Sequence, residues 1–544
     1  MESALKKESG LKNRRALAIF LWAFSPILLP ASLSQTRSTE SQPALEVLRR
    51  AIAGKVEKGE VVSLSIAVAQ KGKIVWEESF GWADKQKKRP ATPYTVYPLA
   101  SLSKSITATG IYLLASQQKI NLEDSVSKHL RSVQLTYYNC SAKDLKVFHL
   151  LNMAGGIPHL FRYYYTDRAD TVPTVKDQIR QFGFTAFSPG SVFHYSNFSF
   201  AILDQLISDA SGVDFPAYMK RAIFDPIGMK HTYADKALIP GAEQIATGYY
   251  SDGSPVQPNR FEPRGGAGIY SCAHDLMLFG LFHLQNRGIS KSTAFINKRL
   301  FAQLHRPRSD LLNSYYANGW GVLKTDNITT LLSNGSIAGC ASTLVLVPER
   351  DIAIVCVSNS TVGNEYTDKV AFEIADILEP GYQEKVNALL AKGEEIFADK
   401  PFVFGLQYEG AWRGFIRTGE TDLPMALRFD ASGKVFASVG SQIEAELRNL
   451  RTSMGLFQAE LFASLPLGTT TKFKHHLELE LQLSASRIGG IVRAVSDENR
   501  PIFSLPYYAE FLRSSHPPAL RQADVCRRET PSDAPALSGS CDDR

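Results

Sequence analysis

Two pairs of short, mostly hydrophobic runs, each joined by polar turn residues, predict two β-hairpins. The first pair covers residues 62–70 and 74–79 and is joined by Lys71-Gly72, a turn signal between two strand-like runs. The second pair covers residues 343–347 and 352–358. Helical spacing precedes the first hairpin and follows the second, at these positions: Leu45, Leu48, Ile52 and Val56, then Val370, Ile374, Ile377 and Leu378.

Between the hairpins, residues 121–330 are mostly helical in pattern, with many loops. Hairpins at both ends of a helical middle predict one antiparallel sheet built from the two ends of a domain, with the helical insertion packed on one of its faces. The predicted fold class is therefore α/β in the broad sense, and α+β more narrowly. We expect the functional site in the cleft between the sheet and the insertion.

From about residue 401, hydrophobic and polar residues alternate with a period of two, a pattern that predicts β-strands. Leu477, Leu479 and Leu481 alternate with Glu478 and Glu480, which is typical of a strand with one buried face. We expect a linker helix over 381–400 and a small closed β-barrel over 401–513. This region resembles the lipocalin-like domain appended to some exported hydrolases. The Pro-, Ser- and Asp-rich stretch 514–544 is predicted to be disordered.

Length and charge narrow the classes of function. A chain of 544 residues is too long for one compact core. Its net charge of +6 leaves no basic patch for nucleic acid, because residues 1–34 carry half of it. Those residues combine basic positions with the short apolar run 16–29, the pattern of a signal peptide. We expect export to the periplasm or medium, with no membrane span after cleavage.

Ser101 and Lys104 form the strongest chemical signal. Three residues is close to one helical turn, so the hydroxyl and the amine can touch. A lysine whose pKa is lowered by burial can remove the serine proton and create a nucleophile. The same spacing recurs at four other places, for example Ser116/Lys119, so context has to distinguish this pair.

That context is a set of segments that resembles the serine β-lactamase and penicillin-binding-protein family, in particular its class C and esterase-like branch. The resemblance covers about residues 43–380, in the family's order. Its segments are YPLASLSKSITATG from Tyr97, HLLNMAGGIPHL from His149, PGSVFHYSN from Pro189, GGAGIYSCAHDLMLFG from Gly265, ANGWGV from Ala317 and SNGSIAGCASTLVLVPERD from Ser333.

The resemblance implies a β-lactamase/transpeptidase-like fold and assigns roles. Ser101, Lys104 and Tyr195 would be catalytic. The substrate would be bound by these residues: Asn197, Ser333, Asn334, Gly335 and Ser336. Gly335 would let the substrate lie close to the strand, because glycine lacks a Cβ atom. No cofactor is implied. We expect no metal site either. His475 and His476 are adjacent in a predicted strand, so their side chains point to opposite faces and cannot bind one metal ion together.

One position departs from the family pattern. The family places lysine or histidine where this chain has Ser333, and Leu160 stands near the position of an amide-recognising residue. Both changes favour a less polar acyl group. We therefore expect an esterase, amidase or peptidase that acts on a small molecule or short peptide through a Ser101 acyl-enzyme. The alternatives are a β-lactamase or D-alanyl-D-alanine carboxypeptidase, or a non-catalytic binding module.

His194 precedes Tyr195, but neighbours in sequence rarely face the same way. We therefore expect His194 to be structural. The sequence does not indicate an oligomeric state.

Overall fold

The computed structural model describes most of the chain between residues 41 and 514. The described ranges are 41–165, 172–262, 264–284, 296–308, 310–311, 315–361, 363–419, 421–467, 470, 472–497 and 502–514. The predicted signal peptide and the predicted disordered tail beyond Ser514 lie outside them, and so do Cys526 and Cys541.

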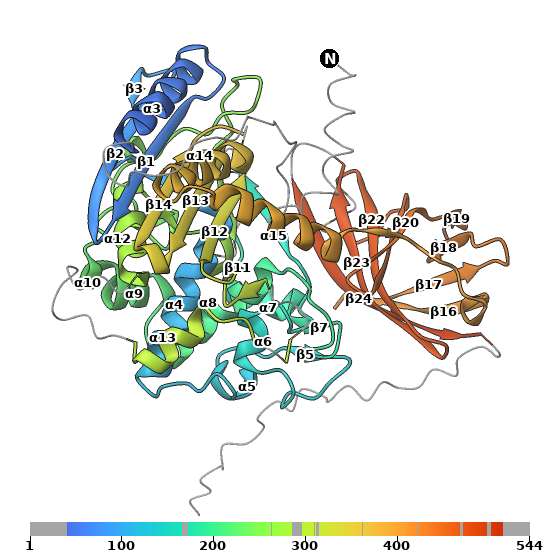
Figure 1. Cartoon of the computed structure of the whole chain (residues 1–544). Coiled ribbons are helices and arrows are strands. Elements are labelled where there is room, and N and C mark those ends of the chain that lie inside the picture. The colour runs from blue at the N-terminus through green and yellow to red at the C-terminus, as the bar shows by residue number, and fades with distance from the viewer. Residues whose placement is uncertain are drawn as a thin grey trace, which may run out of the picture.

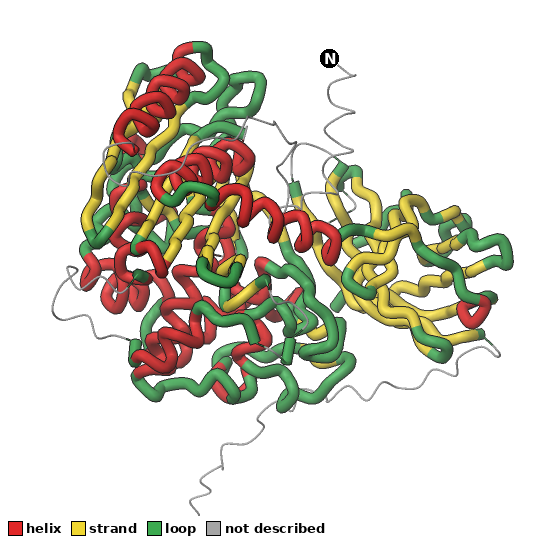
Figure 2. The backbone as a smooth tube through the Cα atoms, viewed as in Figure 1, coloured by secondary structure: helices red, strands yellow, loops and turns green. Residues whose placement is uncertain are grey.

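The first lobe is built on an eight-stranded antiparallel sheet. The two predicted hairpins meet in it, since β1 pairs with β14 and Ile66 lies opposite Cys356. The sheet therefore joins the two ends of the domain, as the pattern predicts (Figures 1 and 2). Its strands in spatial order are β10 (Tyr316–Ala317), β11 (Trp320–Lys324), β12 (Thr329–Ile337), β13 (Cys340–Val347), β14 (Ile352–Ser358), β1 (Ser63–Gln70), β2 (Lys73–Asp84) and β3 (Arg89–Pro90).

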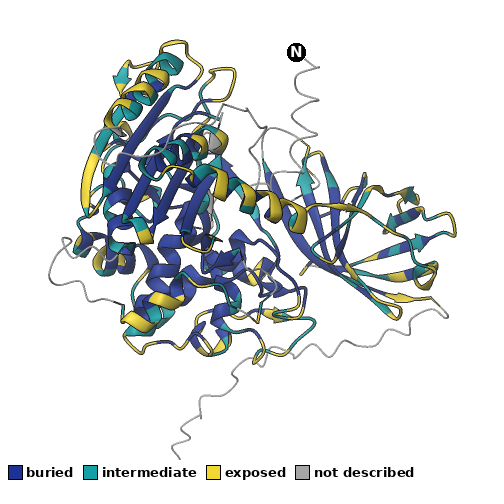
Figure 3. Ribbon diagram, in the orientation of Figure 1, coloured by how far each residue is buried: buried dark blue, intermediate teal, exposed yellow. Residues whose placement is uncertain are grey.

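Helices cover both faces of this sheet. On one face, α3 (Ser41–Glu57) and α14 (Gly363–Leu378) share a core with alternate residues of the central strands. The helical insertion packs on the other face and shares a large apolar core with it, whereas the outer helices of the insertion keep exposed residues (Figure 3). The helices of the insertion are α4 (Ser103–Ser116), α5 (Val126–His129), α6 (Val147–Leu151), α7 (Val175–Phe182), α8 (Asn197–Ser211), α9 (Phe215–Met219), α10 (Asp225–Ile227), α11 (Arg264–Ala267), α12 (Ala273–His283) and α13 (Lys298–Leu304).

The second lobe is a curled antiparallel sheet, to which α15 (Tyr382–Phe397) leads from the first lobe (Figure 1). We expected a closed barrel; among the described residues the sheet is an open half-barrel whose outer strands, β15 and β19, do not pair. Its strands in order are β15 (Lys400–Pro401), β20 (Arg448–Ser453), β21 (Leu456–Leu461), β22 (His475–Leu483), β23 (Arg487–Ser496), β24 (Phe503–Arg513), β16 (Gly410–Arg417), β17 (Asp422–Phe429), β18 (Val435–Val439) and β19 (Ala445–Glu446).

The two lobes are joined by more than the linker helix. β24 pairs with β6 (Phe161–Tyr165) of the first lobe, and β6 pairs in turn with β8 (Asn259–Glu262). Residues 184–192 of the first lobe also share a small apolar core with β21, β23 and β24. The second lobe is thus docked against the insertion. Within the described ranges, no helix combines the length and apolarity needed to cross a membrane.

Candidate active site

Ser101 lies at a sharp turn in front of a buried helix. A short 3₁₀ turn, Ala100–Leu102, leads directly into α4, and Ala100 has a φ of 49°, in the left-handed region that is costly for a residue with a Cβ atom. Residues 103–114 of α4 are all buried, whereas Ser101 is partly exposed. The turn therefore presents one hydroxyl to solvent on an otherwise enclosed element.

Lys104 is buried beneath Ser101 and contacts three oxygen atoms. Its Nζ lies 3.1 Å from Ser101 Oγ, 2.6 Å from Asn197 Oδ1 and 2.8 Å from the Gly266 carbonyl oxygen. Burial lowers the pKa of Lys104 well below its ordinary value. A neutral amine has two protons and one lone pair. Because the amide and carbonyl oxygens can only accept, they take the two protons, and the lone pair is left for the Ser101 hydroxyl.

Tyr195 is the second hydrogen-bonding partner of the Ser101 hydroxyl. Its hydroxyl donates a hydrogen bond of 2.8 Å to Ser101 Oγ, and its ring centroid lies 4.8 Å from Lys104 Nζ. Burial raises the pKa of Tyr195. The phenol therefore stays protonated at neutral pH and acts as a donor. The structure thus brings Ser101, Lys104, Tyr195 and Asn197 together, as the sequence predicts.

Helix α8 fixes the position of Asn197, its first residue. Ser196 is the N-cap, and its side chain accepts a hydrogen bond from the Ser199 amide. Close packing brings Gly266 to the same place, because a Cβ atom there would lie 2.6 Å from the Asn197 carbonyl oxygen. We predicted no role for the adjacent glycines Gly265 and Gly266, which lie in α11. Adjacent glycines allow close backbone approach, and that signal could have identified the Gly266 carbonyl.

Strand β12 lies against the nucleophile turn at Gly335. A Cβ atom on Gly335 would lie 2.3 Å from the Leu99 carbonyl oxygen and 2.5 Å from the Ser101 nitrogen. The space next to Gly335 is filled by the chain's own backbone, so our expectation that glycine here makes room for substrate is corrected. Its lack of a side chain lets strand and turn meet. β11 pairs with β12 only up to Leu332 among the described residues, and Ser336, one residue after Gly335, is partly exposed.

The side chains of Ser333 and Asn334 point to opposite faces of β12. Ser333 is buried toward α4, where its hydroxyl donates a 2.9 Å hydrogen bond to Ser105 Oγ. Asn334 faces α14, and its Nδ2 donates a 2.9 Å hydrogen bond to Asp368. The expected substrate contact of the Asn334 side chain is therefore wrong, because alternation along a strand turns it away from Ser101.

His159 was missed by the sequence analysis. It lies beside the Tyr195 ring, with ring centroids 6.1 Å apart, and its Nδ1 accepts a hydrogen bond of 3.4 Å from the Asn197 amide. Burial, followed by the positive charge of Arg493, lowers the pKa of His159 to about 3. The ring is therefore neutral near the site. His159 lies within the HLLNMAGGIPHL segment that carries the family resemblance, and this was the one sequence signal that could have identified it.

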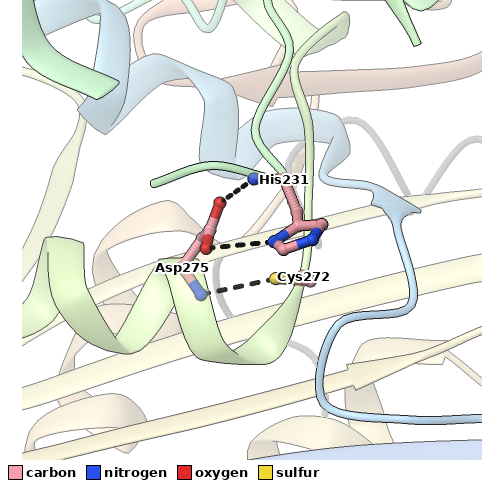
Figure 4. A group of neighbouring side chains, drawn as sticks. All are labelled: His231, Cys272 and Asp275. Atoms are coloured by element: carbon pink, nitrogen blue, oxygen red, sulfur yellow. Dashed lines mark hydrogen bonds and ion pairs between the residues drawn. The ribbon is translucent and has the colours of Figure 1, made fainter. Parts of the chain in front are cut away.

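A separate cluster at the start of α12 was also not foreseen. His231, Cys272 and Asp275 place their ligand atoms within 4.8 Å of one another (Figure 4). Asp275 Oδ2 accepts hydrogen bonds from the His231 amide and the Thr232 hydroxyl, and Cys272 Sγ accepts one from the Asp275 amide. Burial raises the pKa of the Cys272 thiol well above its ordinary value. Cys272 is the N-cap residue of α12, and its contact with the Asp275 amide caps this helix.

Comparison with known proteins identifies relatives of this chain. Residues 48–379 match the Beta-lactamase family. The chain is 24% identical to Protein flp of Staphylococcus aureus over 344 residues, 61% of this chain and 66% of the relative. It is also 24% identical to Penicillin-binding protein 4* of Bacillus subtilis over 327 residues, 56% of this chain and 70% of the relative.

One solved structure shares the fold beyond the first lobe. The octameric penicillin-binding protein homologue from Pyrococcus abyssi aligns with a TM-score of 0.52 at 19% identity, covering 86% of this chain and 99% of its own. The chain spans about two thirds of the length of the Staphylococcus relative. Since the family match takes in more than half of the sequence, including Ser101, Lys104 and Tyr195, this protein belongs to the beta-lactamase family.

Proposed function

We propose that this protein is an exported serine hydrolase that transfers the acyl group of a small, uncharged ester or amide to Ser101 and then to water. One observation supports the proposal above all others. Ser101 Oγ lies within hydrogen-bonding distance of a desolvated Lys104 amine and a protonated Tyr195 phenol at the same time. The first can remove a proton and the second can supply one. Export rests on residues 1–34 of the sequence alone.

In the acylation step, Ser101 Oγ forms a bond to the substrate carbonyl carbon while its proton passes to the Lys104 lone pair. The carbonyl oxygen gains negative charge, and the backbone N–H groups of Ser101 and Ser336 would stabilise it. When the bond to the leaving group breaks, Tyr195 protonates the departing oxygen or nitrogen. Lys104 then restores the proton of Tyr195, whose ring lies against its amine.

In the deacylation step, a water molecule takes the place of the leaving group. Lys104 accepts one proton of this water, directly or relayed by the Tyr195 hydroxyl, as the oxygen bonds to the acyl carbon, and this proton passes to Ser101 Oγ when the ester bond breaks. Asn197 takes part indirectly by holding one proton of Lys104. The raised pKa of Tyr195 supports Lys104 as the principal base of the resting enzyme.

The substrate preference rests on Ser333. Relatives that bind a substrate carboxylate use a cation at this position, whereas here the side chain is a buried hydroxyl bonded to Ser105. Leu160, near the other recognition position, is buried as well. A carboxylate would therefore lose its hydration here without gaining an ionic partner at this position. This supports an uncharged acyl group over a penicillin or a D-alanyl-D-alanine peptide.

Intact-protein mass spectrometry tests the proposal. The mature chain and Ser101→Ala are incubated with a fluorophosphonate, a penicillin and an activated short-chain ester. We expect the fluorophosphonate to add permanently to wild type, the ester to add and be released, and neither to label Ser101→Ala. A stable or released penicillin adduct would favour the β-lactamase or carboxypeptidase alternative. A folded wild-type protein that no reagent labels would overturn the hydrolase proposal in favour of a binding module.

A further inference from the structure

The second lobe buries a group of charged side chains against the active-site lobe. Glu478 and Glu480 lie on the face of β22 opposite its leucines, and each is 8% exposed. Arg493 of β23 bridges them, at 2.7 Å from Glu478 and 2.9 Å from Glu480. Although burial opposes ionisation, Arg493 lowers the pKa of both carboxyl groups. Both therefore stay ionised in the interface.

Only one of the two carboxylates reaches the active-site lobe. Glu480 Oε2 lies 2.9 Å from His194 Nε2, while the other ring nitrogen of His194 lies 3.0 Å from the Ile157 carbonyl oxygen. A carboxylate and a carbonyl can only accept hydrogen bonds. Both contacts are therefore made at once when both ring nitrogens of His194 carry protons.

His194 is also the first residue of the segment that carries Tyr195 and Asn197. Its amide donates a 2.8 Å hydrogen bond to the Met153 carbonyl oxygen, Ser196 Oγ donates one of 2.7 Å to Pro158, and the Asn197 amide donates to His159. The segment 194–197 is thus held along residues 153–159 on one side. Glu480 holds it through the His194 side chain on the other.

The geometry points to a positioning role for the second lobe: we propose that Glu480, through His194, sets the place of the Tyr195 hydroxyl over Ser101. Adjacent side chains in an extended segment point in opposite directions, so His194 reaches the second lobe while Tyr195 reaches Ser101. A shift of His194 would tilt the phenol away from a hydrogen bond of 2.8 Å. Glu480 and His194 touch no substrate, and this inference rests on the proposed function.

Glu478 provides a matched control. It lies on the same strand face, has the same exposure and pairs with the same arginine, but its other neighbour is His476 within the second lobe. Glu480→Gln and Glu478→Gln both remove one buried charge next to Arg493. We expect Glu480→Gln alone to lower kcat for the activated ester about tenfold with KM within twofold, because only its contact bears on Tyr195.

Hydrogen exchange followed by mass spectrometry gives a readout that does not depend on activity. Peptides spanning residues 192–199 should exchange faster in Glu480→Gln than in wild type. In Glu478→Gln their exchange rate should equal that of wild type. His194→Gln should reproduce both effects without disturbing the pairing of Arg493, and it serves as the second variant if Glu480→Gln unfolds. Equal kcat and equal exchange in the two glutamate variants would overturn the inference. If the wild-type protein hydrolyses no ester, the proposed function fails. The hydrogen-exchange result still tests the positioning role of Glu480 and His194 in that case.

Discussion

Lys104 and Arg493 are both cations buried in the protein, yet their surroundings have opposite effects. Lys104 has an amide oxygen, a carbonyl and a hydroxyl around it and no carboxylate among its hydrogen-bond partners, and burial lowers its pKa. Arg493 lies between two carboxylates and stays charged. Burial without a counter-ion produces a neutral, reactive base, whereas burial with counter-ions produces a fixed contact. A neutral amine such as that of Lys104 can act as a catalytic base, whereas a charged guanidinium such as that of Arg493 can hold two lobes together.

Removing the base should have the largest effect. Lys104→Met keeps the length of the side chain but has no lone pair for the Ser101 proton, so we expect ester hydrolysis to fall by about 10⁴-fold. Steady-state kinetics would measure the loss, with circular dichroism to verify folding. Retention of a tenth of the activity would show that another group is the base.

Removing Arg493 from the buried charged cluster should lower the stability of the folded protein. Arg493→Met leaves Glu478 and Glu480 buried without their cation, and we expect it to lower the free energy of unfolding by about 3–5 kcal/mol. Arg487→Met is the control, because Arg487 pairs with Glu510 at the partly exposed start of β23 and should cost less than about 1 kcal/mol. Urea denaturation measures both. Equal losses of unfolding free energy in the two variants would mean that the buried cluster stabilises the protein no more than a surface ion pair does.

Gly335→Ala probes the contact between β12 and the nucleophile turn. The new methyl group would overlap the backbone of Leu99 and Ser101, so we expect kcat/KM to fall by about 100-fold through displacement of the turn. Gly54→Ala, in α3, has no atom within 4 Å of the added Cβ and should leave activity unchanged. Full activity in Gly335→Ala would show that the turn tolerates movement.

Ser333→Ala should have the smallest effect. It removes one buried hydrogen bond to Ser105 and should lower the free energy of unfolding by about 1 kcal/mol. If the acyl group is uncharged, KM for a neutral ester should change less than about twofold. A tenfold rise in KM would instead make the Ser333 hydroxyl a direct substrate ligand.

The first lobe was predictable from the sequence because its signals are local. Short apolar runs joined by turn residues predicted both hairpins, and the helical spacing from Leu45 to Val56 agrees with α3. Ser101 and Lys104 lie one turn apart, so their contact follows from helix geometry alone. The contacts of Tyr195 and Asn197 span more than ninety residues, and only the family resemblance could bring them together.

The docking of the second lobe was not predictable in this way. The leucines of β22 face an apolar interior as expected, but alternation reports only which face is apolar. It predicted one buried face, whereas Glu478 and Glu480 on the other face are buried too, and Glu480 contacts His194, nearly three hundred residues earlier in the chain. A polar face that is buried by tertiary contacts has the same sequence pattern as one that faces water.

The rate of fluorophosphonate labelling of Ser101 as a function of pH tests the central claim most directly. A base acts only when it is unprotonated, so labelling must slow as the pH falls through the pKa of Lys104. Because burial lowers that pKa, we predict a rate that reaches its plateau well below the pKa of an ordinary lysine and declines only at more acidic pH. A rate that keeps rising toward about pH 10.4, the value of an ordinary lysine, would contradict the account.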